Sequence, residues 1–269
     1  DTLGAGDQGV MVGYACNETP EYLPMPVVAA QRLVTLLEIS RLTGVIPDIG
    51  PDGKVQVTME YDDDIPVRIT TVVISVQHQP DTDLDDLFEK LKKNIFPLAF
   101  DGMPADDAEI ILNPSGKFVQ GGPDADTGLT GRKLMVDSYG TFAPHGGGAF
   151  SGKDATKVDR SAAYMARYIA KNMVAAHLAD RCQVTLAYAI GEKEPVMVDV
   201  NTFGTGICED DCLAAAVRKA YDLTPAGIIK QLNLLNPIYS RTAAGGHFGR
   251  EDFPWENIER MSDLAAYIV

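Results

Sequence analysis

Cysteine is scarce in this sequence, with four residues among 269, at positions 16, 182, 208 and 212. They are too few and too scattered for the disulfide framework of a small secreted domain. Cys208 and Cys212 are separated by three residues, but no second pair of cysteines or histidines lies nearby to complete a zinc site. We therefore expect reduced, structural thiols and a cytoplasmic protein.

Positive charge is also in short supply, because 23 Lys and Arg stand against 38 Asp and Glu, for a formal net charge of −15. A binder of nucleic acid or of anionic membranes needs a broad basic face, so this balance argues against both partners. No apolar run reaches the length of a membrane span, and no signal peptide opens the sequence. The apolar fraction of 45% is nevertheless enough to bury a full core.

Arrangements that supply a catalytic nucleophile are missing as well. The four histidines, at positions 78, 145, 177 and 247, are isolated, and none has a partner at metal-ligand spacing. No stretch suggests a Ser/His/Asp or Cys/His site. We expect core or surface roles for all four histidines.

What the sequence does contain is an order of elements that occurs twice. The first half predicts a helix over 27–43 that Gly44 ends, a hairpin with strands in 55–61 and 67–77, a helix capped by Asp81 or Asp83 and ended by Pro97, and a short strand over 108–112. The second half predicts a helix over 160–178, a hairpin from 183–191 and 195–204, a helix over 209–223, and a further helix that Thr224 and Pro225 begin. Leu-Asn-Pro follows in each half, at 112–114 and 235–237. The sequence therefore predicts an α+β fold of two related domains, 1–119 and 120–269.

Glycine is concentrated in the stretch HGGGAFSGKDATKVDR, residues 145–160. The spacing from Gly147 to Gly152 and Lys153 resembles a P-loop, whose backbone N–H groups surround phosphate oxygens. Asp154 stands where a P-loop needs Ser or Thr for Mg²⁺, which argues against a P-loop nucleotide hydrolase or kinase. Glycine still allows a close approach of the backbone to a ligand.

Cations and acids accompany these glycines. Five cations fall between positions 132 and 160, and we expect them in non-periodic loops rather than on the outer face of a helix: Arg132, Lys133, Lys153, Lys157 and Arg160. Such a cluster indicates a polyphosphate site, although solvated surface lysines explain many similar runs. Four acids lie in the same kind of loop: Asp7, Asp52, Asp126 and Asp159. They suit Mg²⁺ beside phosphate, while each alone is more often a turn former or, for Asp159, a helix cap.

Taken together, GAGDQG (4–9) and GGGAFSGKD (146–154) are similar to the two signature stretches of S-adenosylmethionine synthetases, also called methionine adenosyltransferases. Further segments resemble that family in order along the chain: GPDGK (50–54), NPSGKFVQGGP (113–123), GLTGRK (128–133), KVDRSAAY (157–164) and GHFGREDFPWE (246–256). The resemblance implies the family's fold, built from three pseudo-repeated sheet-plus-helices domains, and its reaction. ATP and L-methionine give S-adenosylmethionine, and the released tripolyphosphate is cut to pyrophosphate and phosphate.

The resemblance also implies cofactors, partners and roles for residues. It implies two Mg²⁺ and one K⁺ per site, and a homodimer or homotetramer with sites between paired subunits. It places the triphosphate against Lys54, Arg132, Lys133 and Lys153, with Asp52 and Lys117 in the same nucleotide site. It puts Lys157 near methionine and phosphate, Asp159 on Mg²⁺, Asp126 on nucleotide and methionine, Asp7 at the reacting groups, and Phe118 with Ala149 on the adenosine. Among these, Lys54, Asp7, Lys153 and Arg132 are the expected catalytic residues.

The resemblance departs at the front, since family members carry an additional N-terminal domain that this sequence does not match. We expect the two domains here to be the latter two of three, and this chain to be a truncated, catalytically deficient form whose partners include its own cleaved N-terminal segment. The alternative is a non-catalytic, oligomerising remnant that binds only nucleotide or polyphosphate.

Overall fold

The computed structural model describes residues 3–268 and contains two compact units. The continuous unit is Met25–Leu129, and the split unit joins the residues up to Pro24 with those from Thr130 onward. These units group residues by contact, so the predicted domains 1–119 and 120–269 remain an interpretation of the sequence. The chain has the predicted α+β character, with helices and two three-stranded sheets.

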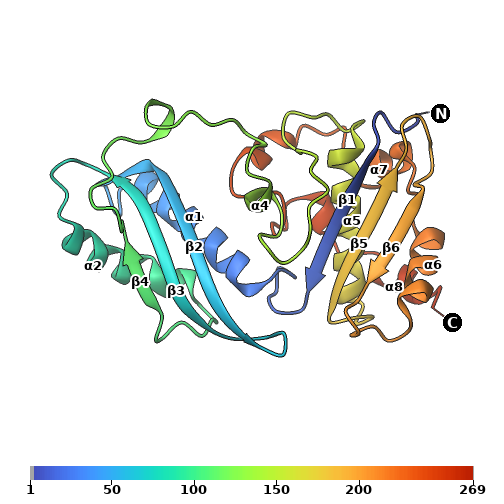
Figure 1. Cartoon of the computed structure of the whole chain (residues 1–269), viewed down its shortest axis with the longest axis horizontal. Helices are drawn as coiled ribbons and strands as arrows, with labels where there is room; N and C mark the ends of the chain where they lie inside the picture. Colours follow the sequence, from blue (N-terminus) through green and yellow to red (C-terminus); the bar gives the residue numbers. More distant parts are fainter. Residues whose placement is uncertain (1–2, 269) are drawn as a thin grey trace. The chain divides into compact units, whose positions relative to one another are not determined.

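The continuous unit holds one sheet of strand order β2-β3-β4 (Figure 1). Its elements are α1 (Met25–Thr43), β2 (Ile49–Asp62), β3 (Ile65–His78), α2 (Leu84–Asn94), α3 (Phe96–Ala99), β4 (Glu109–Leu112) and the 3₁₀ turn η1 (Gly122–Asp124). β2 and β3 form the predicted antiparallel hairpin, and β4 runs parallel to β3. Val55, Val57 and Met59 pack together against the buried core, as their alternation predicted.

In this unit the end of α1 and the start of α2 follow the predicted capping signals, whereas the predicted end of α2 does not. α1 stops at Thr43, directly before Gly44, as predicted. Asp83 caps α2, because its side chain accepts the N–H groups of Asp85 and Asp86. The prediction that Pro97 ends this helix is wrong: α2 already ends at Asn94, and Pro97 lies in the first turn of α3. A proline costs nothing there, because the N–H it lacks has no helical partner at that position.

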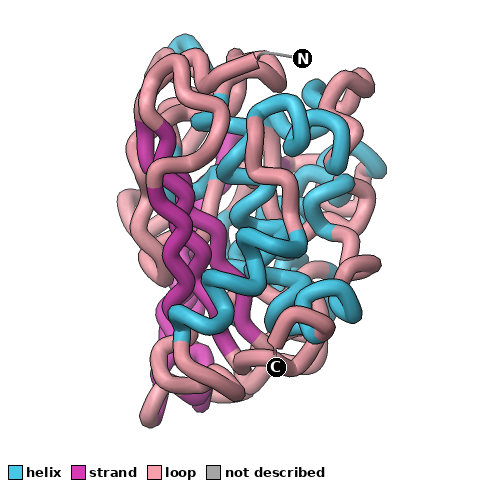
Figure 2. The backbone as a smooth tube through the Cα atoms, turned by 90° about the vertical axis from the view of Figure 1, so that its right-hand side faces the viewer, coloured by secondary structure: helices cyan, strands magenta, loops and turns pink. Residues whose placement is uncertain are grey.

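The split unit holds the second sheet, of order β1-β5-β6, with both pairings antiparallel. Its strands are β1 (Gly9–Cys16), β5 (Arg181–Tyr188) and β6 (Met197–Asn201). The helices are α4 (Leu134–Asp137), α5 (Val158–Ala175), α6 (Asp210–Ala220), α7 (Pro225–Gln231) and α8 (Met261–Ala265), with 3₁₀ turns η2 (Tyr239–Ala243) and η3 (Pro254–Glu256). Figure 2 shows helices to one side of the strands. Strand β1 is not among the predicted elements.

Helix α5 is the central element of this unit. Of its 18 residues, all but Asp159 are buried, and it packs against β1 and β5. A buried ion cluster of Arg167, Lys171 and Glu256 holds the helix in place. Arg167 pairs with Glu256 at 2.8 Å, and Lys171 pairs with the same carboxylate at 2.8 Å. Arg167 also donates to the carbonyl oxygens of Tyr14 and Tyr22, both at 2.8 Å. One guanidinium thus connects the N-terminal segment of the unit, at Tyr14 and Tyr22, to Glu256 in its C-terminal segment.

None of the helices within residues 3–268 is both long and apolar enough to cross a bilayer.

Candidate functional site: the glycine-rich loop of the split unit

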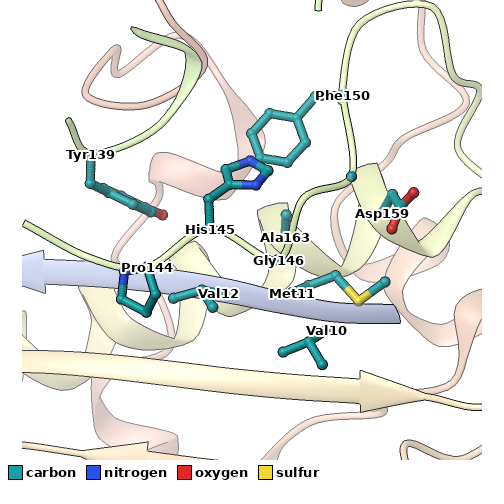
Figure 3. Close-up of a pocket in the computed structure, with 11 residues that line it drawn as sticks. Val10, Met11, Val12, Tyr139, Pro144, His145, Gly146, Phe150, Asp159 and Ala163 are labelled. Atoms are coloured by element: carbon teal, nitrogen blue, oxygen red, sulfur yellow. The ribbon is translucent and has the colours of Figure 1, made fainter. Parts of the chain in front are cut away.

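The glycine-rich loop, residues 145–153, lies against β1. A Cβ atom on Gly146 would overlap the carbonyl oxygen of Val10, so only glycine permits this approach of the two backbones. A small pocket forms between the loop, β1 and α5, and Figure 3 shows His145, Phe150 and Asp159 among its lining residues. His145 accepts the Gly147 N–H through Nδ1 at 2.8 Å, which bends the loop at its first glycines.

Asp159 is the point at which the two glycine-rich segments meet. Its carboxylate Oδ2 lies 2.5 Å from the Lys153 ammonium, and a Cβ atom on Gly148 would overlap the same carboxylate. A Cβ atom on Gly9 would lie 3.1 Å from Asp159 Oδ1. The alternative role of Asp159 as a helix cap is wrong, because Lys157 is the N-cap residue of α5. The structure therefore brings GAGDQG and GGGAFSGKD around one ion pair.

Lys157 and Asp7 lie at the same end of the split unit. The backbone of Gly6 lies against Lys157, since a Cβ at Gly6 would be 4.0 Å from the lysine Cδ. The Lys157 side chain is 48% exposed and lies 3.7 Å from Asp154 Oδ2. Asp7 is exposed and accepts its neighbour's N–H, from Gln8, at 2.8 Å. Both charged groups are therefore accessible to solvent.

A second basic segment borders the loop. A Cβ atom on Gly131 would lie 3.4 Å from the Ala149 Cβ and 3.2 Å from the Ser151 carbonyl oxygen. The next two residues, Arg132 and Lys133, are exposed. Two loops that are separate in sequence thus place their cations on neighbouring backbone segments, as an anion site requires.

Arg160, the fifth cation of the predicted cluster, departs from the expectation of a loop position. It lies in α5 and is 3% exposed. Its guanidinium donates to the Lys153 carbonyl oxygen and to Thr242 Oγ1, both at 2.8 Å, and to the Tyr164 hydroxyl at 2.9 Å. Arg160 therefore supports the loop from beneath instead of facing solvent.

His247 is a residue of this region that the sequence analysis assigned only a core or surface role. It is fully buried, and its Nε2 lies 3.2 Å from Ser151 Oγ, while Nδ1 lies 2.7 Å from the Tyr164 hydroxyl. Asp137 Oδ1 lies 3.8 Å from the same Nε2. A Ser/His/Asp triad needs serine and aspartate on opposite ring nitrogens, so this group is not a nucleophile-activating triad. No local signal in the sequence marks His247, because its partners are more than 80 residues away.

His247 predicts an acid-sensitive fold. Burial, reinforced by the charges of Arg160 and Arg250, lowers the pKa of His247 from 6.5 to about 3. The unfolded chain therefore binds a proton that the folded chain excludes, and the free energy of unfolding falls as the pH drops below 6.5. We expect a loss of roughly 2 kcal/mol from this group between pH 6.5 and pH 5, measured by urea denaturation. The variant His247→Gln should show a shallower loss; an equal loss would contradict this assignment.

The remaining predicted site residues lie in the continuous unit, near the start of β2 and the end of β3. Asp52 Oδ2 accepts the Gly122 N–H at 2.8 Å. Phe118 donates its N–H to His78 Nε2 at 3.0 Å, and Lys117 donates to the Pro80 carbonyl oxygen at 2.8 Å. Lys54 is exposed on β2 opposite Ser75, and Asp126 is exposed one residue after η1's C-cap. This unit therefore gathers five of the predicted residues: Asp52, Lys54, Lys117, Phe118 and Asp126.

Among the described residues, the acidic side chains suit a metal ion that is bound jointly by protein and phosphate oxygens. Within residues 3–268 there is no group of three or more His, Cys, Asp or Glu side chains placed to hold a metal ion. Mg²⁺ takes one or two carboxylates and fills its shell with water and phosphate oxygens. The carboxylate of Asp159, beside a lysine and glycine backbone, fits such a phosphate-bridged ion.

Comparison with known protein families covers nearly the whole chain. A family model described as S-adenosylmethionine synthetase, central domain, matches residues 2–118, and one described as S-adenosylmethionine synthetase, C-terminal domain, matches residues 120–257. The S-adenosylmethionine synthases of Lacticaseibacillus casei (strain BL23) and Lacticaseibacillus paracasei (strain ATCC 334) are each 54% identical over 274 residues, covering 99% of this chain and 69% of their own length. That of Nocardioides sp. (strain JS614) is 54% identical over 271 residues, covering 99% of this chain and 68% of its own length.

Proposed function

Since this chain belongs to the S-adenosylmethionine synthetase family, we propose that it is a methionine adenosyltransferase polypeptide. Its reaction joins ATP and L-methionine into S-adenosylmethionine and then hydrolyses tripolyphosphate to pyrophosphate and phosphate. The observation that carries this proposal is the meeting of both glycine-rich segments at the Lys153–Asp159 pair. Glycine backbone, cations and one carboxylate at one place suit a metal-bound polyphosphate.

The proposed substitution at ribose C5′ requires little proton transfer by the protein. The methionine sulfur attacks ribose C5′, the new S–C bond forms as the C5′–O bond breaks, and the electron pair leaves with tripolyphosphate. The thioether sulfur is already a neutral nucleophile and needs no general base. The protein must align the reacting atoms and stabilise the departing polyanion.

Cationic side chains stabilise the leaving group in this proposal. Arg132, Lys133 and Lys153 bind the triphosphate from the glycine-rich loop and its neighbour, and Lys157 lies where methionine and phosphate meet. Lys54, in the continuous unit, is also proposed to bind triphosphate. Lys153 and Asp159 pair with each other at 2.5 Å, and when the polyanion binds, the ammonium would bind a phosphate oxygen and the carboxylate would be free to hold Mg²⁺.

Carboxylates and aromatic groups complete the proposed site. Asp159 holds Mg²⁺, Asp126 binds nucleotide and methionine, and Asp7 faces the reacting groups. Phe118 and Ala149 pack on the adenosine, with Asp52 and Lys117 in the same nucleotide site. Two Mg²⁺ ions and one K⁺ are proposed per site, and Mg²⁺ when bound shields the phosphate charge. Assembly as a homodimer or homotetramer, and a cytoplasmic location, belong to the same proposal.

The 269-residue chain by itself is proposed to be catalytically deficient. Its matches cover 68–69% of the length of its relatives, and we propose that the family's site also uses residues outside the aligned region. We expect incubation with ATP, methionine, Mg²⁺ and K⁺ to yield S-adenosylmethionine at least about 100-fold more slowly than a full-length relative. Addition of the relative's unaligned region should restore product, measured by chromatography.

A parallel incubation with the Lys153→Met variant is the control, and it should stay at background with or without the added region. If the unmutated chain binds tripolyphosphate but forms no product with or without the added region, the chain is the non-catalytic polyphosphate binder of the alternative hypothesis.

A further inference from the structure

A chain of hydrogen bonds connects the buried Arg160 to the surface of the glycine-rich loop. It runs from Arg160 Nε to the Tyr164 hydroxyl at 2.9 Å, on to His247 Nδ1 at 2.7 Å, and from His247 Nε2 to Ser151 Oγ at 3.2 Å. Arg160, Tyr164 and His247 are 3%, 0% and 0% exposed, whereas Ser151 is partly exposed. Only the last member of this relay is accessible to a ligand.

Arg160, the first residue of the relay, determines which group donates and which accepts in each of its hydrogen bonds. A guanidinium only donates, so the Tyr164 oxygen accepts from Arg160 and its own proton must go elsewhere. The neighbouring acceptor is His247 Nδ1. The opposite arrangement, with a proton on Nδ1, would leave the Tyr164 hydroxyl proton buried without an acceptor, which costs free energy.

His247 then carries its proton on Nε2 and donates it to Ser151 Oγ. The serine oxygen is an acceptor in this bond, so its own hydroxyl proton is directed away from His247. Within residues 3–268 the Ser151 hydroxyl makes no other hydrogen bond, so its proton remains available to a ligand. The relay thereby turns Ser151 into an outward donor.

The surroundings of Ser151 identify what such a donor meets. Its backbone lies beside Gly131, and Gly131 directly precedes the exposed Arg132 and Lys133. Ser151 itself lies two residues before Lys153. Arg160 also holds the Lys153 carbonyl oxygen at 2.8 Å, and it makes no ion pair within residues 3–268. A buried cation beneath the loop, whose charge also acts on the Asp137 carboxyl, adds positive potential to a surface that already carries three exposed or half-exposed cations.

We infer that Ser151 is a further ligand-binding residue of the site, donating its hydroxyl proton to a phosphate oxygen, and that Arg160, Tyr164 and His247 are the positioning residues that orient it. This inference rests on the proposed polyphosphate-binding function. The relay explains why a histidine, a tyrosine and an arginine are buried together beneath an exposed loop: they set the direction of one hydroxyl group.

Binding of inorganic tripolyphosphate with Mg²⁺, measured by titration calorimetry on the full chain, tests the donor. Ser151→Ala should bind about tenfold more weakly, the loss of one hydrogen bond to a charged group. Ser262→Ala is the matched control, because this exposed serine lies on α8 away from the loop and should bind like the unmutated chain. Lys153→Met distinguishes the role of Ser151 from the proposed polyphosphate site as a whole. If Lys153→Met weakens binding and Ser151→Ala does not, the role of Ser151 is wrong while the site stands; if the unmutated chain does not bind, both are wrong.

The relay has its own test, which needs no ligand. Long-range ¹H–¹⁵N spectra of the chain should show His247 with a protonated Nε2 and an accepting Nδ1 between pH 7 and pH 5. Tyr164→Phe, which keeps the ring, should abolish this fixed tautomer and weaken tripolyphosphate binding by about threefold, with melting curves used to verify folding. A proton on Nδ1 in the unmutated chain would overturn the relay.

Discussion

Replacing Lys153 with Met is expected to lower S-adenosylmethionine formation by about two to three orders of magnitude, in the assay supplemented with the relative's unaligned region. The ammonium of Lys153 lies 2.5 Å from Asp159 at the meeting point of both glycine-rich segments. It is the cation that the glycine backbone holds nearest to the proposed metal ligand. In the proposed mechanism, its loss removes charge stabilisation at the point where the triphosphate departs.

The matched control is Lys193→Met, which removes an exposed lysine from the turn between β5 and β6. It changes the net charge equally, so it should leave turnover and tripolyphosphate binding within about twofold of the unmutated chain. Urea denaturation of Lys153→Met should give a near-native free energy of unfolding, since the pair is partly exposed at 32% and 17%. Full activity in a folded Lys153→Met variant would refute the phosphate assignment.

Replacing Glu256 with Ala is expected to reduce the free energy of unfolding by about 3–5 kcal/mol. Its carboxylate is fully buried and pairs with Arg167 and Lys171, and it accepts the Gly249 N–H at 2.8 Å. Burial alone would raise the pKa of Glu256, but Arg167 and Lys171 hold it below its ordinary value. The truncation would leave two buried cations without a counter-charge, which costs more than the lost hydrogen bonds.

Urea denaturation at pH 7 measures this effect, with Glu194→Ala as the control. Glu194 is an exposed acid before β6, and its removal should change the free energy of unfolding by less than about 0.5 kcal/mol. A loss below about 1 kcal/mol for Glu256→Ala would mean that the cluster rearranges and that it is not what joins the two ends of the split unit.

The elements that could be predicted from sequence are those whose signal is local. α1, the two hairpins, β4, α5 and α6 occur where the sequence pattern predicts them, and Thr224 caps α7 as predicted. β1 was missed because GVMVGYAC is a continuous apolar run without alternation, buried from Met11 onward. Its pairing partner β5 follows about 170 residues later, so nothing nearby in the sequence identifies it as a strand.

The candidate site likewise contains some features that the sequence predicts and others that only the fold determines. Gly146 and Gly148 carry a visible signal, because backbone approach demands glycine and the sequence shows three in succession. The expectation that Arg160 lies in a loop was wrong, whereas the predicted helix over 160–178 included it correctly; its burial was missed because residue identity alone does not tell an exposed cation from a buried one. Its burial depends on Thr242, which is 82 residues away.

By itself the sequence determined which residue types are available for the chemistry: the glycines that permit backbone approach, the cations that follow them, and the absence of a motif for a nucleophile. Tertiary structure alone decided which of these groups meet, and in which protonation state. The pairing of Lys153 with Asp159, the neutral His247 and the outward hydroxyl of Ser151 all depend on burial and on partners that the chain brings together only on folding. Burial sets the cost of charge and of unmet hydrogen bonds, and burial is a property of the packed chain.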